Sequence, residues 1–475
     1  MTTKRIRIIG GGLAGPEAAL QAAKRGCEVD LYEMRPTRST EAHQTSDFAE
    51  LVCSNSLKSE SENTAPWLLK QEMRRAGSIL LAEADATAVP AGHALAVDRV
   101  EFSKRVAARI AAEPRITVHR EEVTRLDPGS SNSDDSGTIT ILASGPLTSP
   151  ALAAELQRLT GSDHLAFYDS ISPIVDATTI DMDKVYFAAR YDKGSADYIN
   201  CPFTKEEYDR FIEALAAAEA VDAKDWERFP ATGTPEKLQY FEGCLPIEET
   251  ARRGRDTLRF GPMKPVGLTD PKTGRWPYAV VQLRQENLRA DSYNLVGFQN
   301  HLKYGEQNRV LKLIPGLENA TFLRYGQIHR NTYIHAPSLL TETLQLKAHP
   351  TIMITGQLSG VEGYTESIAS GMQAGIYAAA IANGQTPTPA PRLSANGSLT
   401  HYITHSETKK FQPANITFDL LPPLEEDLRK KIRDKKERHR IQCDRALEAW
   451  NAWLAGLTEF SLSNAGADVR SVRTL

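Results

Sequence analysis

A glycine-rich turn near the start of the chain, between a short apolar strand and a helix, does most to constrain the fold. Residues 5–9 are rich in isoleucine and predict a strand, and residues 16–24 are alanine-rich and predict a helix. The turn between them has the G-x-G-x-x-G spacing, which lets the backbone approach a pyrophosphate whose charge the helix N-terminus stabilises. We therefore expect a bound dinucleotide at this turn. The expected contacts are Gly10, Gly11, Gly12, Leu13, Ala14 and Gly15.

The residues that follow the turn strengthen this prediction. Residues 28–32 predict a second strand, which ends at Glu33, about twenty residues on, where an acid that binds a ribose is expected. An acid at this place, and not an arginine, favours a free 2′-hydroxyl and so an NAD-like or FAD-like adenosine over NADP. The alternative is a turn that only lets the helix pack closely on the strand. A turn that serves packing alone does not require a second strand and a terminal acid after the helix, so this order favours the dinucleotide.

A second strand, glycine turn and helix occurs at about three quarters of the chain. Residues 351–355 predict a strand, residues 356–364 a glycine turn, and residues 367–382 a helix of small side chains. Two such turns are typical of a flavin domain built from two chain segments, with one helix N-terminus near the flavin. FAD is therefore favoured over NAD, and a turn that serves packing alone is the alternative. The expected cofactor contacts here are Gly356, Gln357, Gly360 and Tyr364.

The length of 475 residues exceeds what one core usually organises, so at least two domains are expected. We expect an α/β fold in which a two-segment Rossmann-like FAD-binding domain carries an inserted α+β substrate domain. The FAD-binding domain is assigned to residues 1–150 and 330–385, the inserted domain to 151–329, and a C-terminal extension to 386–475. Residues 127–137 are polar throughout and predict a surface loop.

Charge and cysteine content exclude several classes of protein. The chain has 56 basic and 60 acidic residues, so no overall field attracts it to nucleic acid or to an anionic membrane. Its five cysteines are an odd number without a CxxC pair, which indicates neither a disulfide framework nor a zinc site, and we expect no metal. The N-terminus is not a signal peptide, and no stretch approaches the roughly 20 apolar residues of a membrane span. These features predict a reduced, cytoplasmic enzyme.

The tail contains a local concentration of positive charge. A charged helix is expected from about Leu424 to Leu454, and nine of the fourteen residues at 427–440 can carry positive charge, counting His439, against three acids. Such a helix can contact phosphates of a nucleic acid. A solvated helix face is an equal alternative, because the rest of the chain is not basic.

Two cysteines are candidates for nucleophilic chemistry. Cys53 is followed by polar capping residues and by Lys58, which predicts a thiol at a helix N-terminus with a lowered pKa, although a buried free cysteine is a more frequent reading. Cys244 lies between a glycine and a Leu-Pro step, so we expect it in a turn, where a reactive role and a structural one are about equal. Cys27 and Cys443 look structural.

Five segments resemble one enzyme family closely. They are residues 8–15, 33–36, 51–56, 241–248 and 356–364, and the two that contain Cys53 and Cys244 are far more specific than a glycine turn. The chain is similar over most of its length to the folate- and FAD-dependent tRNA (uracil-5-)-methyltransferases, the TrmFO family.

This resemblance implies a reaction as well as a fold. In it, 5,10-methylenetetrahydrofolate supplies a carbon and FAD reduced by NAD(P)H supplies the hydride that together convert uridine 54 of the tRNA T loop to 5-methyluridine. It also implies that Cys244 adds to uracil C6, which makes C5 nucleophilic, and that Cys53 acts as a base at C5 or traps the methylene. Tyr364 is then placed to pack on the flavin or the pterin, or in the core. The implied partner is the tRNA T arm, with neither a membrane nor an obligate protein partner.

Other functions remain open at this stage. A wobble-uridine tRNA-modifying flavoprotein shares the first glycine turn, but that type is longer and works with a partner protein. A small-molecule FAD-dependent oxidoreductase explains both turns but neither Cys53 nor Cys244, which lack the spacing of a disulfide reductase. A non-catalytic dinucleotide-sensing or RNA-binding module is the third alternative.

Overall fold

The computed structural model describes residues 5–40, 42–126, 138–161, 165–221, 245–407 and 411–467. Side chains are not described at 165–169, 328–330 and 458–467. Two predictions, the surface loop at 127–137 and the turn around Cys244, lie outside the described residues.

The first sheet is parallel and is built from two distant segments of the chain. Its strand order is β16-β7-β1-β2-β6, and each neighbouring pair is parallel. The strands are β1 (Ile6–Ile9), β2 (Val29–Tyr32), β6 (Ile116–His119), β7 (Ile139–Leu142) and β16 (Ile352–Ile354). Because β16 comes some 200 residues after β7 and pairs beside it, the predicted two-segment α/β fold is confirmed.

The two helices that follow the glycine turns pack directly against each other. They are α1 (Ala14–Lys24), after β1, and α11 (Tyr364–Ala382), after β16. A Cβ on Gly371 of α11 would lie 2.3 Å from the Ala14 carbonyl oxygen, so only glycine allows this approach. At the start of α1, a Cβ on Gly15 would lie 1.8 Å from the Gly10 carbonyl oxygen. The glycines therefore bring both turns to one place in the fold.

Further elements complete this part of the molecule. A small antiparallel sheet has the order β3-β5-β4, formed by β3 (Ser56–Ser59), β4 (Ala88–Val89) and β5 (Ala94–Val97). The remaining helices before the second sheet are α2 (Ala65–Ala76), α3 (Ile79–Ala86), α4 (Arg99–Ala112) and α5 (Pro150–Thr160). One continuous hydrophobic core, from Ile6 to Trp453, joins these elements other than β4 to the C-terminal helices, and Val89 of β4 belongs to a small separate cluster.

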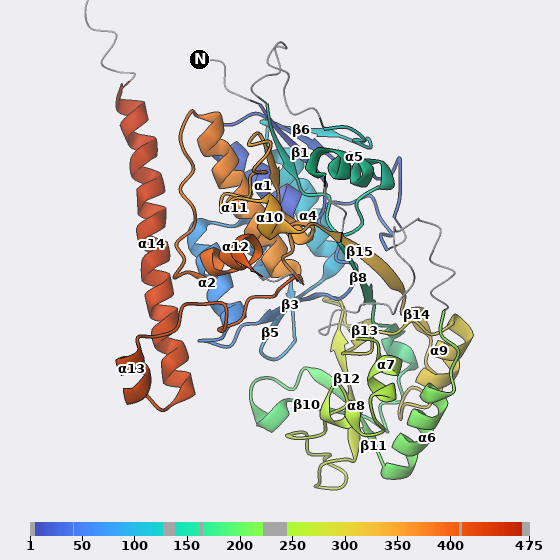
Figure 1. Ribbon diagram of the computed structural model, residues 1–475. Helices are drawn as coiled ribbons and strands as arrows, with labels where there is room; N and C mark the ends of the chain where they lie inside the picture. Colours follow the sequence, from blue (N-terminus) through green and yellow to red (C-terminus); the bar gives the residue numbers. More distant parts are fainter. Residues whose placement is uncertain are drawn as a thin grey trace, which may run out of the picture.

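The middle of the chain forms a second, antiparallel sheet with its own core, drawn in green and yellow in Figure 1. Its order is β10-β11-β12-β13-β9-β14. The strands are β9 (Ile174–Asp176), β10 (Tyr186–Ala188), β11 (Tyr198–Phe203), β12 (Ala279–Gln285), β13 (Ser292–Leu295) and β14 (Phe322–Arg324). Its helices are α6 (Lys205–Ala216), α7 (Ile247–Arg252), α8 (Thr257–Phe260) and α9 (Tyr304–Leu311). The paired strands β8 (Leu165–Ser170) and β15 (Ile328–Tyr333) carry the chain out and back, as an insertion requires.

The tail corrects one prediction. The continuous helix expected from Leu424 to Leu454 is two helices, α13 (Glu426–Lys431) and α14 (Lys435–Ala467). They follow α10 (Ala336–Leu339) and α12 (Ala395–His405) in the chain. The break has a physical cause, since the Asp434 side chain accepts a hydrogen bond from the Lys436 backbone N–H at 2.9 Å and so begins a new helix. In Figure 1, α14 (red) runs beside α2. The indole N–H of Trp450 in α14 donates a hydrogen bond to the Glu72 carbonyl oxygen in α2.

No helix among the described residues is both long enough and apolar enough to cross a membrane.

Candidate active site

A cleft opens where the strands of the parallel sheet end, between the two glycine turns. Its empty volume is about 1020 Å³, including space open to solvent. Nine residues predicted from the sequence line it: Gly10, Gly11, Gly12, Leu13, Ala14, Glu33, Gly356, Gln357 and Tyr364. Gly15 and Gly360 were also predicted as contacts but are not among the lining residues. Gly15 serves the packing described above, and Gly360 adopts a positive φ of 93° after the turn.

Two helix N-termini reach this cleft without a side-chain cap. The N-cap residues are Leu13 for α1 and Gly363 for α11, and neither makes a side-chain hydrogen bond to the first turn. By contrast, Thr64 caps α2 and Ser149 caps α5. The first N–H groups of an uncapped helix are available to an anion, and the helix dipole favours negative charge there. Both turns therefore suit the phosphates of a dinucleotide.

Glu33 is held in place by the first turn itself. One oxygen of its carboxylate accepts the Gly11 backbone N–H at 2.8 Å, and the other accepts Arg35 Nε at 2.9 Å. Burial opposes ionisation of Glu33, but the hydrogen bonds and the charge of Arg35, with the Gly11 N–H, lower its pKa overall. The carboxylate is thus charged and fixed beside the cleft, as an acceptor for ribose hydroxyls would be.

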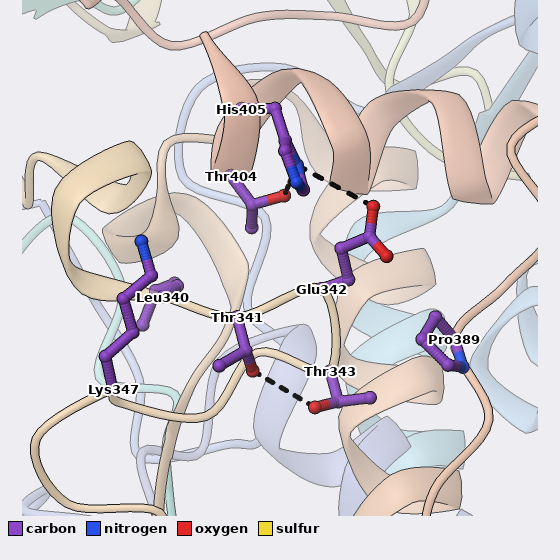
Figure 2. A pocket seen from close by; sticks show the side chains of 8 residues that line it. All are labelled: Leu340, Thr341, Glu342, Thr343, Lys347, Pro389, Thr404 and His405. Atoms are coloured by element: carbon purple, nitrogen blue, oxygen red, sulfur yellow. Dashed lines mark hydrogen bonds and ion pairs between the residues drawn. The ribbon is translucent and has the colours of Figure 1, made fainter.

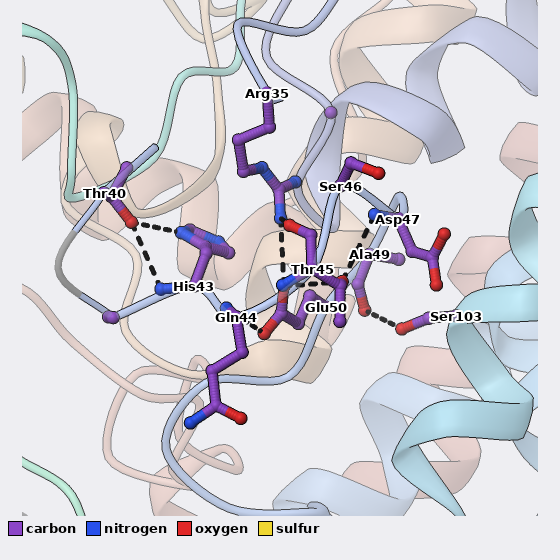
Figure 3. A network of polar contacts seen from close by, with 12 residues as sticks. Arg35, Thr40, His43, Gln44, Thr45, Ser46, Asp47, Ala49, Glu50 and Ser103 are labelled. Carbon is purple, nitrogen blue, oxygen red and sulfur yellow. Dashed lines mark hydrogen bonds and ion pairs between the residues drawn. The ribbon is translucent and has the colours of Figure 1, made fainter. Parts of the chain in front are cut away.

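A second acid shapes the loop on one side of the cleft (Figure 3). Glu50 accepts hydrogen bonds from the backbone N–H groups of Gln44 and Thr45, at 2.8 and 3.1 Å, and from the Thr45 hydroxyl at 2.9 Å. Arg35 Nη1 also lies 3.1 Å from Glu50, so this arginine bridges Glu33 and Glu50. The loop that contributes His43 to the cleft lining is therefore fixed by carboxylates.

Cys53 lies next to this cleft, but not as the sequence predicted. The residues after it form strand β3, so the expected helix N-terminus at Cys53 is wrong. The Cys53 backbone N–H donates instead to the Tyr364 hydroxyl oxygen at 2.6 Å, as does the Ser54 N–H at 3.2 Å. The Cys53 thiol donates to the Ser170 carbonyl oxygen at 3.7 Å. Tyr364 is the first residue of α11 and lines the cleft, so it ties the cysteine to the second glycine turn.

The positive charge near Cys53 comes from residues that the sequence analysis missed. Lys58 was the expected cation, but its ammonium binds Glu366 and Asn415, each at 2.6 Å. Arg99 and Arg324 instead interact electrostatically with both Cys53 and Tyr364. No sequence signal marks this pair, because one begins helix α4 and the other ends strand β14. They meet only through the tertiary fold.

Burial, neighbouring charges and one carboxylate determine the pKa shifts of the groups around Cys53. Burial disfavours the charged form of Arg99, but its 2.6 Å ion pair with Glu286 helps raise its pKa. Burial and the charge of Arg99 lower the pKa of Arg324, whose Nε has no hydrogen-bond partner among the described residues. Burial also raises the pKa of Tyr364, so its hydroxyl stays protonated. The site thus holds a neutral phenol and two cations around one thiol.

The other cysteines fit structural roles. Cys27, Cys201 and Cys443 are fully buried, and burial raises the pKa of each thiol, that of Cys443 to about 12. They are therefore poor nucleophiles. Cys244 precedes the described segment that begins at residue 245, so its reactive role stays a prediction.

Comparison with known proteins now decides the family. Residues 5–386 match the profile of the family described as glucose inhibited division protein A. A protein of Koribacter versatilis named methylenetetrahydrofolate–tRNA-(uracil-5-)-methyltransferase TrmFO is 67% identical over 451 residues, which cover 95% of this chain and 98% of that protein. The chain belongs to the TrmFO family. A TrmFO protein of Enterococcus faecalis is 53% identical over 446 residues, covering 94% of this chain and 98% of its own.

The structural comparison agrees about the fold. The GidA structure from Aquifex aeolicus has a TM-score of 0.68 to this chain at 16% identity, covering 96% of this chain and 74% of that one. At that identity the likeness shows the fold alone. The cleft of this TrmFO-family chain fits FAD on its own geometry, because two uncapped helix N-termini and the Glu33 carboxylate face one space.

Proposed function

We propose that this protein uses 5,10-methylenetetrahydrofolate and FAD to methylate C5 of uridine 54 in the tRNA T loop. The observation that carries the proposal is the position of Cys53, which Tyr364 ties to the second glycine turn beside the cleft. An FAD-dependent oxidoreductase of small molecules needs the glycine turns but has no use for this thiol. The name shared by the close relatives agrees with the proposal.

The cofactor contacts are proposed to be those of the cleft. The N-terminus of α1 holds the pyrophosphate, the N-terminus of α11 lies near the ribityl chain or the isoalloxazine, and Glu33 accepts the ribose hydroxyls. When bound and reduced by NAD(P)H, FAD supplies the hydride that completes the methyl group.

The residues of the chain supply the activation of uracil. C5 of uracil is a weak nucleophile, and addition of a thiolate to C6 gives an enolate that is nucleophilic at C5. We assign this addition to Cys244, on the family resemblance, and the removal of the C5 proton or the capture of the methylene to Cys53. Arg99 and Arg324 place positive charge near Cys53, and the Tyr364 hydroxyl fixes the loop that carries this cysteine.

The same proposal assigns a function to each domain of the chain. We assign FAD binding to residues 1–150 and 330–385, and folate and tRNA binding to the inserted residues 151–329, with residues 386–475 as a C-terminal extension. The separate hydrophobic core between Val175 and Ala320 supports this division, although α5 at the start of the inserted segment packs into the first core. The free cysteines Cys27, Cys201 and Cys443 and a tRNA substrate support a cytoplasmic location.

The deciding experiment is an assay with T-arm RNA, NAD(P)H and 5,10-methylenetetrahydrofolate labelled at its methylene carbon, with and without S-adenosylmethionine. We expect label in uracil without S-adenosylmethionine, and a yellow protein after gentle purification. A colourless protein, or label that requires S-adenosylmethionine, would contradict the proposal. An anticodon-arm RNA is the matched control, because a wobble-uridine enzyme would modify that arm.

The assignment of the two thiols has its own test. RNA that carries 5-fluorouridine at position 54 should form a covalent complex with the wild-type protein and with Cys53→Ala, but not with Cys244→Ala. Persistence of the complex in Cys244→Ala would reverse the two roles.

A further inference from the structure

A cluster of three potential metal ligands lies outside the cleft. Helix α12 presents His401 and His405, which are four residues apart and so on one face, toward Glu342. One ring nitrogen of each histidine and one carboxylate oxygen lie within 4.8 Å of one another. Nδ1 of His401 is 3.5 Å and Nδ1 of His405 is 3.7 Å from the same oxygen of Glu342. Figure 2 shows His405 and Glu342 facing each other across the pocket beside α12.

The two histidine rings lie against each other beside the carboxylate. They stack with centroids 4.4 Å apart and an interplanar angle of 11°, and both Nδ1 atoms lie within 3.7 Å of the same Glu342 oxygen. An unprotonated imidazole nitrogen supplies the lone pair that a metal requires.

The surroundings permit a small cation to enter and be held. The three side chains are between 38% and 48% exposed, so the ligand atoms are accessible. Of the nearby cations, Lys347 donates to the Pro337 carbonyl oxygen and Arg392 to the Ser398 hydroxyl, and Arg392 also interacts electrostatically with Glu342. The Thr404 hydroxyl lies 2.9 Å from Nδ1 of His405, so an ion bound at this nitrogen would replace that hydrogen bond.

We propose that Glu342, His401 and His405 bind one divalent transition-metal ion, zinc being the ion whose chemistry fits two imidazoles and a carboxylate. Three ligands leave the fourth tetrahedral position to water. The composition had given no indication of a metal, because these ligands come from distant parts of the chain and include no cysteine.

The ion would have a structural role, because it would join two segments that are distant in the sequence. Glu342 lies in the segment between α10 and β16, whereas the histidines belong to α12, so the ion would join the strand that completes the parallel sheet to the C-terminal helices. None of the three residues is among those that line the cleft. The ion is therefore not required for methyl transfer, and this inference stands independently of the proposed function.

Calorimetric titration of chelator-treated, full-length protein with Zn²⁺ tests the site, and Co²⁺ tests its geometry by visible absorption. We expect His401→Gln, His405→Gln and Glu342→Gln each to raise the dissociation constant at least about tenfold and to abolish the Zn²⁺-dependent rise in Tm. The control is His93→Gln, at an exposed histidine on another part of the chain, and it should bind as the wild type does.

The outcomes are distinct. Equal Zn²⁺ binding by the wild type and all three ligand variants would assign the ion to thiols elsewhere and overturn the proposal, as would no binding by the wild type. If the wild type and His93→Gln bind and the ligand variants fold but do not, the site is established. Loss of T-arm methylation in folded ligand variants would overturn the structural role.

Discussion

At the scale of single residues, the Tyr364 hydroxyl is the contact on which the position of Cys53 most depends. Tyr364→Phe removes the oxygen that accepts the N–H groups of Cys53 and Ser54. Unsatisfied buried donors cost about 1–3 kcal/mol, so we expect kcat to fall by about tenfold or more, with FAD content unchanged. The matched control is Tyr377→Phe, the same change on the same helix, whose hydroxyl bonds to Gln373 and Ala390. Equal kcat values for the two variants would show that Tyr364 does not position the cysteine.

A second prediction at this scale concerns the cations around Cys53. Because the charge of Arg324 interacts electrostatically with Cys53, we expect Arg324→Gln to slow alkylation of Cys53 by iodoacetamide several-fold, measured by mass spectrometry of the Cys53 peptide. Buried Cys27 and Cys201 should stay unmodified in the folded protein and serve as internal controls. An unchanged rate at Cys53 would remove Arg324 from the proposed mechanism.

Sequence reasoning gave the correct position for residues whose place in the fold follows from local pattern. Gly10 to Ala14, Glu33 and Gly356 line the cleft because their positions at strand ends follow from spacing along the chain. The predicted environment of Cys53 was wrong in two respects: no helix begins there, and Lys58 is not the neighbouring cation. Both errors arose because contacts with residues some 50 to 310 positions away determine that environment, and no local pattern encodes them.

At the scale of elements, one buried glutamate joins three helices. Glu72 of α2 accepts the backbone N–H groups of Ala395 and Asn396 at the start of α12, at 2.7 and 2.9 Å. The carbonyl oxygen of the same residue accepts the indole N–H of Trp450 from α14. Burial raises the pKa of Glu72 to about 7, although the hydrogen bonds from Asn396 and Ala395 oppose this. The docking of α12 on α2 is therefore linked to pH.

The sign of this linkage gives a prediction. Folding raises the pKa of Glu72, so the protonated form stabilises the fold fully below about pH 4.5, and this stabilisation is lost as pH rises through 7. Between pH 5 and 8 we expect the free energy of unfolding to fall by up to about 3 kcal/mol from this group, and Glu72→Gln to remove that fall in urea titrations. Glu155→Gln is the control, because the Arg158 hydrogen bond lowers the pKa of Glu155 to about 2, outside this range. The same slope in both variants would contradict the linkage.

The elements themselves were predicted where hydrophobic pattern and glycine turns agree, as in β1, α1, β16 and α11. The tail helix was predicted as one unit because its charge pattern is continuous through Ile432. The structure divides it at Asp434, an N-cap residue with Glu437 three positions later, and that local signal is present in the sequence.

At the scale of the whole molecule, net charge conceals how charge is distributed. The overall balance of 56 basic and 60 acidic residues excludes a general attraction to RNA, yet the exposed cations of α13 and the start of α14 lie together on the tail. Some of this charge is already neutralised locally, since Lys430 pairs with Glu426 at 2.8 Å and Arg440 with Glu437 at 2.7 Å. Lys431, Arg433 and Lys436 are exposed. Substitution of these three residues distinguishes a tail that contacts tRNA from a helix face that is only solvated.

The salt dependence of tRNA binding makes this distinction, because each phosphate contact releases a counterion. If the tail binds tRNA, Lys431→Gln, Arg433→Gln or Lys436→Gln should each reduce the slope of log K against log salt concentration by about 1 and weaken binding of all tRNAs alike. The control is Lys104→Gln, at an exposed lysine on α4, which should leave the slope unchanged. The slopes are measured by filter binding between about 50 and 200 mM salt. Slopes equal to the wild-type value in all three tail variants would make the tail a solvated face, and the inserted domain would then have to supply the phosphate contacts.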